Sequence, residues 1–202
     1  FVGHPVLESG ADRGDAARFR AAHGLDPATK LLAVMPGSRG GELARHLPIF
    51  TRAIALLRQR FTTLGVVIPT LPRLVDAVRT APWPVAPIVT AETGDKHDAW
   101  AAATAALAKS GTTSLELAVA GVPQVVAYRV NPVTAAIVRR LVTVPHASLV
   151  NLLAGEAVAA GRSALEAVGR GQEHRRVQRA VIVEGVVSVM DGAGGEAPVR
   201  RR

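Results

Sequence analysis

Short apolar runs alternate with segments of helical periodicity over most of this chain. This alternation is typical of βαβ units, in which parallel strands form a central sheet and the connecting helices cover it. The predicted strands are Leu31–Met35, Gly65–Pro69, Ala86–Thr90, Ala105–Lys109 and Gln124–Tyr128. The predicted helices are Glu42–Arg60, Leu71–Arg79, Asp98–Ala102, Ser114–Ala120 and Pro132–Val142. The pattern therefore predicts an α/β fold, a Rossmann-like parallel sheet with helices on both faces.

The character of the sequence changes at about residue 159. Residues 159–202 contain Gly- and Arg-rich stretches around one isolated apolar run, with no clean helical face and no strand–helix alternation. We therefore expect one folded domain over residues 1–158 and an atypical tail over 159–202, either frameshifted or disordered. The chain opens on Phe1 rather than Met, so we expect that residue 1 is not the natural start.

The net charge of +8 and the sequence pI near 11.3 suit three kinds of partner: nucleic acid, an anionic membrane surface or a small polyanionic ligand. The positive charges are spread along the chain and do not alternate with aromatic residues, which disfavours nucleic acid. No stretch approaches the ~20 apolar residues that a membrane span requires. The absence of cysteine excludes a disulfide framework and a thiolate metal site.

A glycine-rich segment, Met35–Glu42, joins the first predicted strand to the following helix. Glycines allow a backbone to approach a ligand closely, and the guanidinium fork of Arg39 suits phosphate oxygens. A flexible turn with a surface arginine explains the same residues equally well. No Lys-Ser/Thr pair follows the glycines, so the segment is not a P-loop.

A second segment with ligand-binding composition, Lys109–Glu116, carries Gly111 among hydroxyl side chains just before a helix. The first N–H groups of a helix are unpaired and its dipole is positive there, so such a turn can hold a pyrophosphate. Glu116 lies about one turn into the helix, where a carboxylate could bond the two hydroxyls of a ribose. Thr113 and Glu116 also have capping-box spacing, and the spacing alone favours the cap.

Other catalytic patterns are weak or missing in the sequence. The six histidines have no HxxxH or HExxH spacing, so we expect no metal site. No GxSxG motif of an α/β-hydrolase occurs. Asn151 is a polar residue inside an apolar stretch, where asparagine by itself is most often a turn or cap residue.

Taken together, five segments resemble those of lipid-A-disaccharide synthases over roughly residues 1–158. They are VGHP (2–5), LLAVMPGSRGGEL (31–43), AKSGTTSLELAVAGVPQVVAYRVNP (108–132), RRLV (139–142) and SLVNLLAGE (148–156). Each motif alone is weak, but order and spacing agree as well as content. The resemblance implies that residues 1–158 are the UDP-sugar-binding, C-terminal domain of a GT-B glycosyltransferase, whose two Rossmann-like domains face each other across a cleft.

The resemblance also implies a reaction. 2,3-Diacylglucosamine passes from its UDP donor to 2,3-diacylglucosamine 1-phosphate, giving the β-1,6-linked lipid A disaccharide phosphate and UDP. The family needs no metal and no other cofactor. These two substrates would be the partners, with no nucleic acid. The location implied is cytoplasmic, peripheral on the inner face of the bacterial inner membrane, and the complete protein could form a homodimer.

The family's functional residues match positions in two loops and two later segments. Arg39 would stabilise negative charge on the departing UDP, as the catalytic contribution of this chain. Matching the family's donor-binding residues are Gly37, Ser38, Arg39, Ser110, Gly111, Thr112, Glu116, Tyr128, Arg129 and Asn151. The match shifts the interpretation of Glu116 from cap toward ligand, although both roles can coexist.

Two departures from the family pattern limit these expectations. The family's N-terminal domain, with its acceptor surface and proposed catalytic aspartate, has no counterpart here. Inverting transfer needs a base, so we expect an inactive donor-binding fragment. The tail also differs from the amphipathic helices that follow NLLAGE in the family. A frameshift in a GC-rich gene would yield its Arg/Gly/Val mixture, and genuine divergence is the alternative. Two alternatives stay open: another GT-B enzyme, such as a UDP-GlcNAc epimerase or the peptidoglycan glucosaminyltransferase, or a non-catalytic basic module that docks on membranes.

Overall fold

The protein is described by a computed structural model that covers residues 5–109, 111–127, 186–187 and 190–191. Its centre is a sheet of five parallel strands in the order β3-β2-β1-β4-β5. The strands are β1 (Lys30–Met35), β2 (Leu64–Pro69), β3 (Ile88–Thr90), β4 (Ala105–Lys109) and β5 (Gln124–Ala127).

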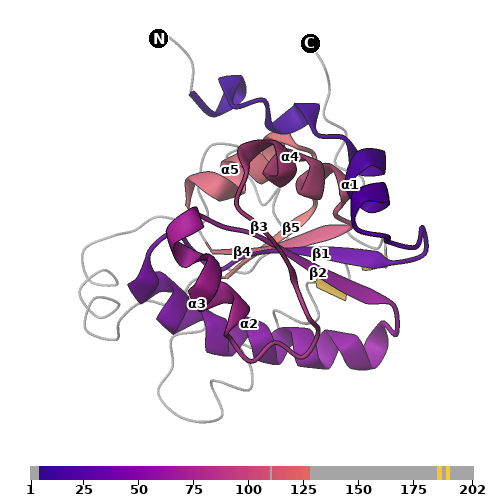
Figure 1. Ribbon diagram of the computed structural model, residues 1–202, viewed down its shortest axis with the longest axis vertical. Helices are drawn as coiled ribbons and strands as arrows, with labels where there is room; N and C mark the ends of the chain where they lie inside the picture. The colour runs from indigo at the N-terminus through magenta and orange to yellow at the C-terminus, as the bar shows by residue number, and fades with distance from the viewer. Residues whose placement is uncertain (1–4, 110, 128–185, 188–189, 192–202) are drawn as a thin grey trace, which may run out of the picture.

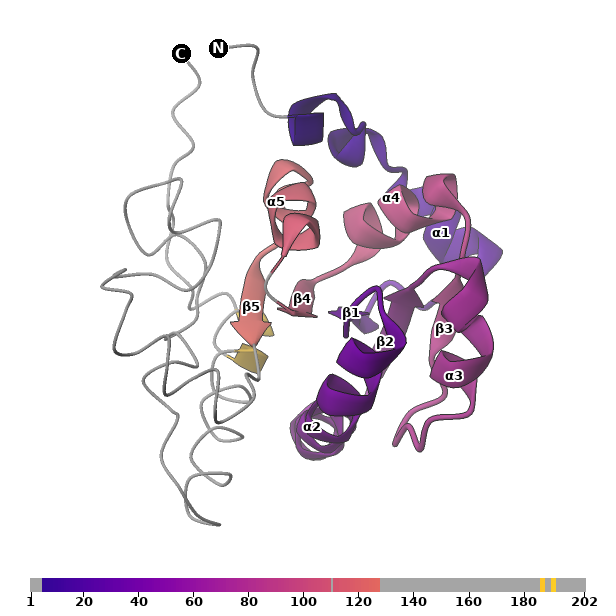
Figure 2. The ribbon, with the colours of Figure 1, turned by 90° about the vertical axis from the view of Figure 1, so that its left-hand side faces the viewer.

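Helices form a layer on each side of this sheet (Figures 1 and 2). One layer contains α1 (Ala16–Ala22), α4 (Thr93–Ala102) and α5 (Thr112–Val119), and the other contains α2 (Gly40–Arg60) and α3 (Val75–Arg79). Short 3₁₀ turns are η1 (Pro5–Glu8), η2 (Ala11–Arg13) and η3 (Pro72–Leu74). The predicted α/β class, with a Rossmann-like parallel sheet covered on both faces, is therefore confirmed.

The strands are continuous apolar runs because both faces of the sheet are covered. In β1, Leu32 and Val34 belong to the core beneath α2, whereas Leu31 and Ala33 belong to the core beneath α1 and α4. This alternation follows from the period of two along a strand. The four residues are fully buried, which anchors β1 at the centre of the sheet.

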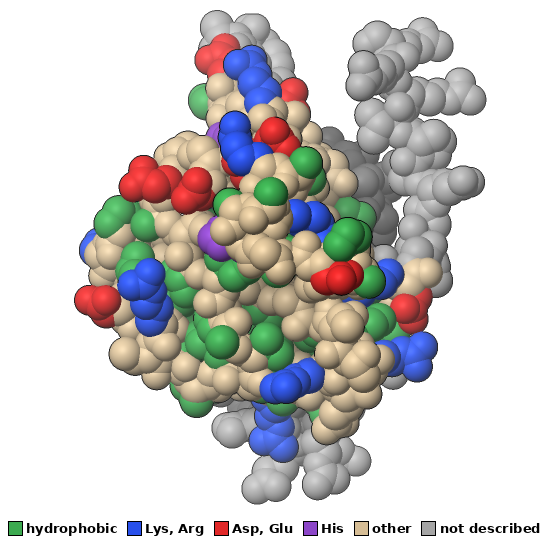
Figure 3. Space-filling view, turned by 45° about the vertical axis from the view of Figure 1, so that its right-hand side comes forward, with side chains coloured by type: hydrophobic (Ala, Val, Ile, Leu, Met, Phe, Trp, Pro, Cys, Tyr) green, Lys and Arg blue, Asp and Glu red, His purple; other side chains and the backbone are tan. Residues whose placement is uncertain are grey.

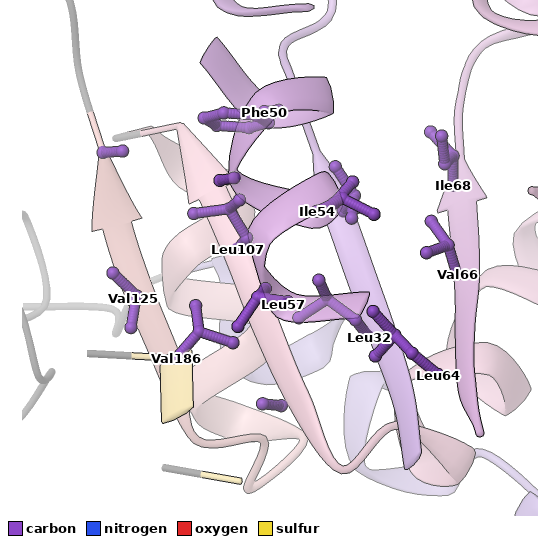
Figure 4. Packing of buried hydrophobic residues seen from close by; sticks show 14 of the residues in the cluster. Leu32, Phe50, Ile54, Leu57, Leu64, Val66, Ile68, Leu107, Val125 and Val186 are labelled. Carbon is purple, nitrogen blue, oxygen red and sulfur yellow. The ribbon is translucent and has the colours of Figure 1, made fainter. Parts of the chain in front are cut away.

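Helix α2 lies on the sheet through an apolar stripe of helical spacing. Phe50, Ile54 and Leu57 are fully buried against the strands, as Figure 4 shows. Burial stabilises the fold by roughly 1.5–3 kcal/mol for each such side chain. Substituting Asp for Leu57 would place a charge in this core and break the helix–sheet contact.

Two residues of the tail lie in the same core. Val186 and Met190 are buried in the cluster beneath α2, and Val186 is visible beside Leu57 and Val125 in Figure 4. The Lys30 Nζ donates to the Met190 carbonyl oxygen at 2.9 Å. Arg60 and Asp191 form an ion pair at 3.3 Å.

The structure extends or adds helices where the sequence lacked apolar periodicity. Helix α4 begins at Thr93, whereas the sequence predicts its start at Asp98. The earlier start has no sequence signal, because the first turn, TGDK, is polar. Helix α1 was not predicted; Phe19 is its one buried residue, and Asp15 caps it by accepting from the Arg18 N–H. The predicted helix over 132–142 lies outside the described residues.

The strand order places the carboxyl ends of β1 and β4 next to each other. From β1 the chain moves outward through β2 to β3, and it then crosses back to β4 on the other side of β1. Met35 pairs with Ala108 in the register of these two strands. Connections therefore leave the β1–β4 boundary in opposite directions, which is the topological switch point where open α/β sheets bind ligands.

Candidate functional site

The loop from β1 to α2, residues 36–39, has a conformation that requires glycine. Gly37 has φ +132°, a region that other residues rarely adopt. A Cβ at this position would lie 2.7 Å from both Cβ and Oε2 of Glu42. Gly37 therefore makes room for a side chain of the protein itself, in addition to any close approach of a ligand.

Glu42, in the first turn of α2, holds this loop in place. Its Oε2 accepts from the Ser38 N–H at 3.0 Å, and its Oε1 accepts from Arg39 Nη1 at 3.3 Å and from Lys109 Nζ at 3.0 Å. Burial alone would raise the pKa of Glu42, but the hydrogen bonds from Lys109, Ser38 and Arg39 and the charge of Lys109 outweigh it. The pKa falls to about 2, so the carboxylate is ionised at neutral pH.

The amino end of α2 offers donors without an intrahelical acceptor, and positive charge, to an anion. The N–H groups of Gly40 and Gly41 open the helix and have no intrahelical acceptor. Arg39 immediately precedes them, with a side chain that is 78% exposed. The Arg73 guanidinium donates to the Ser38 carbonyl oxygen at 2.9 Å, which holds a further cation beside the loop. Together these groups favour phosphate.

The connection from β4 to α5, residues 110–111, differs in its backbone. Gly111 occupies the N-cap position of α5 with extended backbone, φ 164°, so its conformation does not demand glycine. The nearest atom to a Cβ placed there would be Lys109 Nζ, at 3.8 Å. Among the residues that the structure describes, a Cβ at Gly111 would therefore make only an ordinary van der Waals contact and would fit without a clash.

The capping box expected from Thr113 and Glu116 is not formed. Helix α5 begins at Thr112, two residues earlier than predicted, so Thr113 lies inside the helix and makes no cap hydrogen bond. Glu116 instead pairs with Lys96 of α4, at 3.1 Å between Oε1 and Nζ. Its carboxylate is thus turned toward α4, where Lys96 also lies 4.7 Å from the centroid of the Trp100 ring.

Lys109 joins the two predicted loops. Its Nζ contacts Glu42 of the first loop's helix, and it lies beside Gly111 at the start of α5. The structure thus brings Gly37, Ser38 and Arg39 to the same edge as Gly111 and Thr112, with Glu116 one turn further along α5. The predicted residues outside the described part of the chain are Ser110, Tyr128, Arg129 and Asn151.

Glu42, Lys109 and Arg73 were not singled out by sequence reasoning. Glu42 could have been found from its place three residues after the N-cap, Arg39, where an acidic side chain often reaches back to preceding N–H groups. The link from Lys109 to Glu42 spans 67 positions of sequence, and no local pattern indicates it.

Three observations concern the surface, the helices and possible metal ligands. On the face shown in Figure 3, Lys and Arg side chains lie among acidic and apolar ones and do not gather into one basic field. No helix among residues 5–109 and 111–127 is long and apolar enough to cross a membrane. Over the same residues, no three His, Cys, Asp or Glu side chains are grouped to hold a metal ion.

Solved structures resemble this chain in fold. A family 9 glycosyl transferase from Veillonella parvula matches with a TM-score of 0.57 at 13% identity, over 95% of this chain and 53% of that one. The spinosyn rhamnosyltransferase SpnG matches with a TM-score of 0.51 at 15% identity, over 87% and 41%. At these identities the likeness shows the fold, and it agrees with the predicted half of a GT-B glycosyltransferase.

Relatives found by sequence are more similar to this chain than these solved structures are. The lipid-A-disaccharide synthase of Granulibacter bethesdensis is 54% identical over 160 residues, which are 78% of this chain and 41% of the relative. That of Gluconobacter oxydans is 49% identical over 160 residues, 78% of this chain and 39% of the relative. The chain thus spans about two fifths of their length. The family model for lipid-A-disaccharide synthetase matches residues 1–166. The chain belongs to the lipid-A-disaccharide synthetase family.

Proposed function

We propose that this chain is the donor-binding part of a glycosyltransferase of lipid A biosynthesis. The donor is UDP-2,3-diacylglucosamine, the acceptor is 2,3-diacylglucosamine 1-phosphate, and the products are lipid A disaccharide phosphate and UDP. One observation carries the proposal beyond family membership. The starts of α2 and α5, with Arg39, Lys109 and Arg73 nearby, converge at the β1–β4 switch point.

Each side chain has a chemical task in this proposal. Arg39 forms charged hydrogen bonds to the diphosphate and stabilises the negative charge that grows on UDP as the sugar bond breaks. The N–H groups at the start of α5 and the hydroxyls of Ser110 and Thr112 bind the same diphosphate. Glu116 accepts hydrogen bonds from the ribose hydroxyls. Tyr128, Arg129 and Asn151 complete the donor site.

The acceptor half of the reaction needs groups from elsewhere. A base must take the proton of the acceptor hydroxyl, and we assign it to the portion of the relatives' length that this chain does not span. The acylated substrates reside in a membrane, so we place the protein peripherally on the cytoplasmic face of the inner membrane, and as a homodimer when complete. The net charge of +8 supports attraction to anionic headgroups. No nucleic acid partner or cofactor is invoked.

Thermal unfolding with and without UDP tests the donor site. We expect millimolar UDP to raise the Tm of the 202-residue chain by several degrees, because a ligand at about 100 times its Kd stabilises by about 2.7 kcal/mol. Arg39→Ala should weaken UDP binding about 10- to 100-fold, since it removes charged hydrogen bonds to phosphate.

Arg52→Ala is the matched control, because Arg52 is an exposed arginine of the same helix, more than three turns from the loop. It should leave the UDP-dependent rise in Tm unchanged. Absence of any UDP effect on the wild-type chain would contradict the proposal. The substrate assignment is tested on a protein of full family length, which should turn over the diacylated donor and not UDP-GlcNAc.

A further inference from the structure

We infer that Glu42 is a positioning residue for the donor diphosphate, and that it acts by gathering Arg39 and Lys109 at the crevice between the two loops. This inference deepens the proposed function and rests on it. Glu42 would not touch the donor. It would set the positions of the groups that contact the donor, which are the two cations and the Ser38 N–H.

The contacts of Glu42 come from both sides of the switch point. Ser38 and Arg39 precede α2, whereas Lys109 ends β4. A single carboxylate, 13% exposed, therefore fixes one backbone donor and two cations, one that precedes α2 and one that ends β4. A side chain that contacts both loops controls the distance between the loops. That distance decides whether one diphosphate can bind to both of them.

Other features of the loop are consistent with a dedicated place for this carboxylate. The backbone at Gly37 leaves open the volume that Glu42 fills, and a Cβ there would lie 2.7 Å from Oε2. Arg73 holds the carbonyl oxygen of Ser38 while Glu42 holds its N–H, so both backbone polar groups of this residue are fixed. The loop is thus pre-organised before a ligand arrives, which lowers the entropy lost on binding.

A competing effect makes the inference testable. Glu42 is negative, and removing its charge would raise the positive potential at the site and attract UDP more strongly. If attraction over distance dominates, Glu42→Gln binds UDP more tightly than the wild type. If positioning dominates, Glu42→Gln binds UDP more weakly, because the amide is a poorer acceptor for Lys109 and Arg39.

The experiment is calorimetric titration of the full 202-residue chain with UDP and, separately, with uridine. We expect Glu42→Gln to raise the Kd for UDP about 10-fold and to change the Kd for uridine less than about twofold, because only UDP has the diphosphate. Lys109→Met should have a similar effect. The double variant should be no worse than the more affected single variant, since both changes break one unit.

Asp98→Asn is the matched control. Asp98 is also a buried carboxylate that accepts from a backbone N–H, that of Asp15 at 2.7 Å, and pairs with an arginine, Arg18. It joins α1 to α4, and its hydrogen bonds and ion pair within the described residues reach neither loop. The Asp98→Asn substitution should lower the Tm and leave the ratio of UDP to uridine affinity unchanged.

The outcomes separate the two proposals. If the wild-type chain does not bind UDP, the proposed function fails. If Arg39→Ala loses UDP while Glu42→Gln keeps the wild-type ratio or tightens UDP, the positioning role alone is overturned. If Glu42→Gln does not fold, Lys109→Met tests the positioning role in its place. An unchanged ratio of UDP to uridine affinity in Lys109→Met also overturns the inference.

Discussion

Gly37 and Gly111 occupy corresponding places, each in a connection from a strand's carboxyl end to a helix, but their surroundings differ. Gly37 has a φ of +132° and a Cβ position already filled by Glu42. Gly111 is extended, and a Cβ there would meet only Lys109 Nζ, at 3.8 Å, among the described residues. The first loop is therefore fixed by the protein's own packing. The second has room at the place where a ligand would approach.

Glycine-rich sequence thus serves two different physical purposes in the two loops. In the β1–α2 loop, glycine is needed for the folded state itself, and the cations of the site are held by a carboxylate. In the β4–α5 connection, glycine is not needed by the backbone, so its small size would matter chiefly to a bound ligand. Three substitutions or titrations test this distinction.

Gly37→Ala should have the largest effect on stability. The substitution places a Cβ against Glu42 and strains the backbone, so the free energy of unfolding should fall by about 2–4 kcal/mol. Urea denaturation measures it. Gly40→Ala is the control, because a Cβ at Gly40 meets nothing within 4 Å and alanine favours a helix. Equal stability of Gly37→Ala and wild type would remove the distinction between the loops.

The Glu42 carboxylate should produce the next largest effect, and it should depend on pH. The pKa is about 2 in the folded chain against an ordinary 4.5, so ionised Glu42 stabilises the fold above pH 4.5. That contribution is lost as the pH falls from 4.5 toward 2.

Urea denaturation of wild type and Glu42→Gln from pH 7 to pH 3 measures this contribution. The difference in unfolding free energy should be on the order of 2 kcal/mol at neutral pH and shrink below pH 4.5. Asp98, whose pKa is also lowered, is present in both proteins, so its effect cancels. A difference that stays constant down to pH 3 would show that Glu42 is not held by the cations.

Gly111→Ala should have the smallest effect on stability. An alanine fits the extended backbone and loses only some N-cap preference, so we expect a loss of about 0.5 kcal/mol. If the donor lies against Gly111, UDP affinity should still fall about 10-fold, as calorimetry would show. A large loss of stability in this variant would make the two glycines alike after all.

The sequence predicted the main elements because burial on both faces leaves a strong local signal. The run LLAVM at 31–35 is apolar throughout, and the run AALAK at 105–109 is apolar except for its last residue. Each run coincides with a strand to within one residue. Helices with a broad apolar stripe, such as α2, were also predicted. Helix α1 was missed, because a seven-residue helix with one buried side chain has no periodicity to detect.

The site was predicted only as far as local chemistry allows. Glycine, arginine and hydroxyl residues placed after strands indicated the two loops, and the family resemblance supplied the roles. The start of α5 was wrong by two residues, because Thr113 and Glu116 have the spacing of a cap while Gly111 takes that position. The partner of Glu116, Lys96, lies on another helix and is set by tertiary packing.

By itself the sequence determined the α/β class, the five strands and the two loops, because hydrophobic periodicity and turn composition are properties of neighbouring residues. Only the tertiary structure decided that β1 lies beside β4, since strand order depends on how crossovers pack. That neighbourhood brings Lys109 to Glu42 across 67 positions and makes one crevice from two separate loops. Contacts over such distances depend on the folded sheet as a whole, so no local pattern can reveal them.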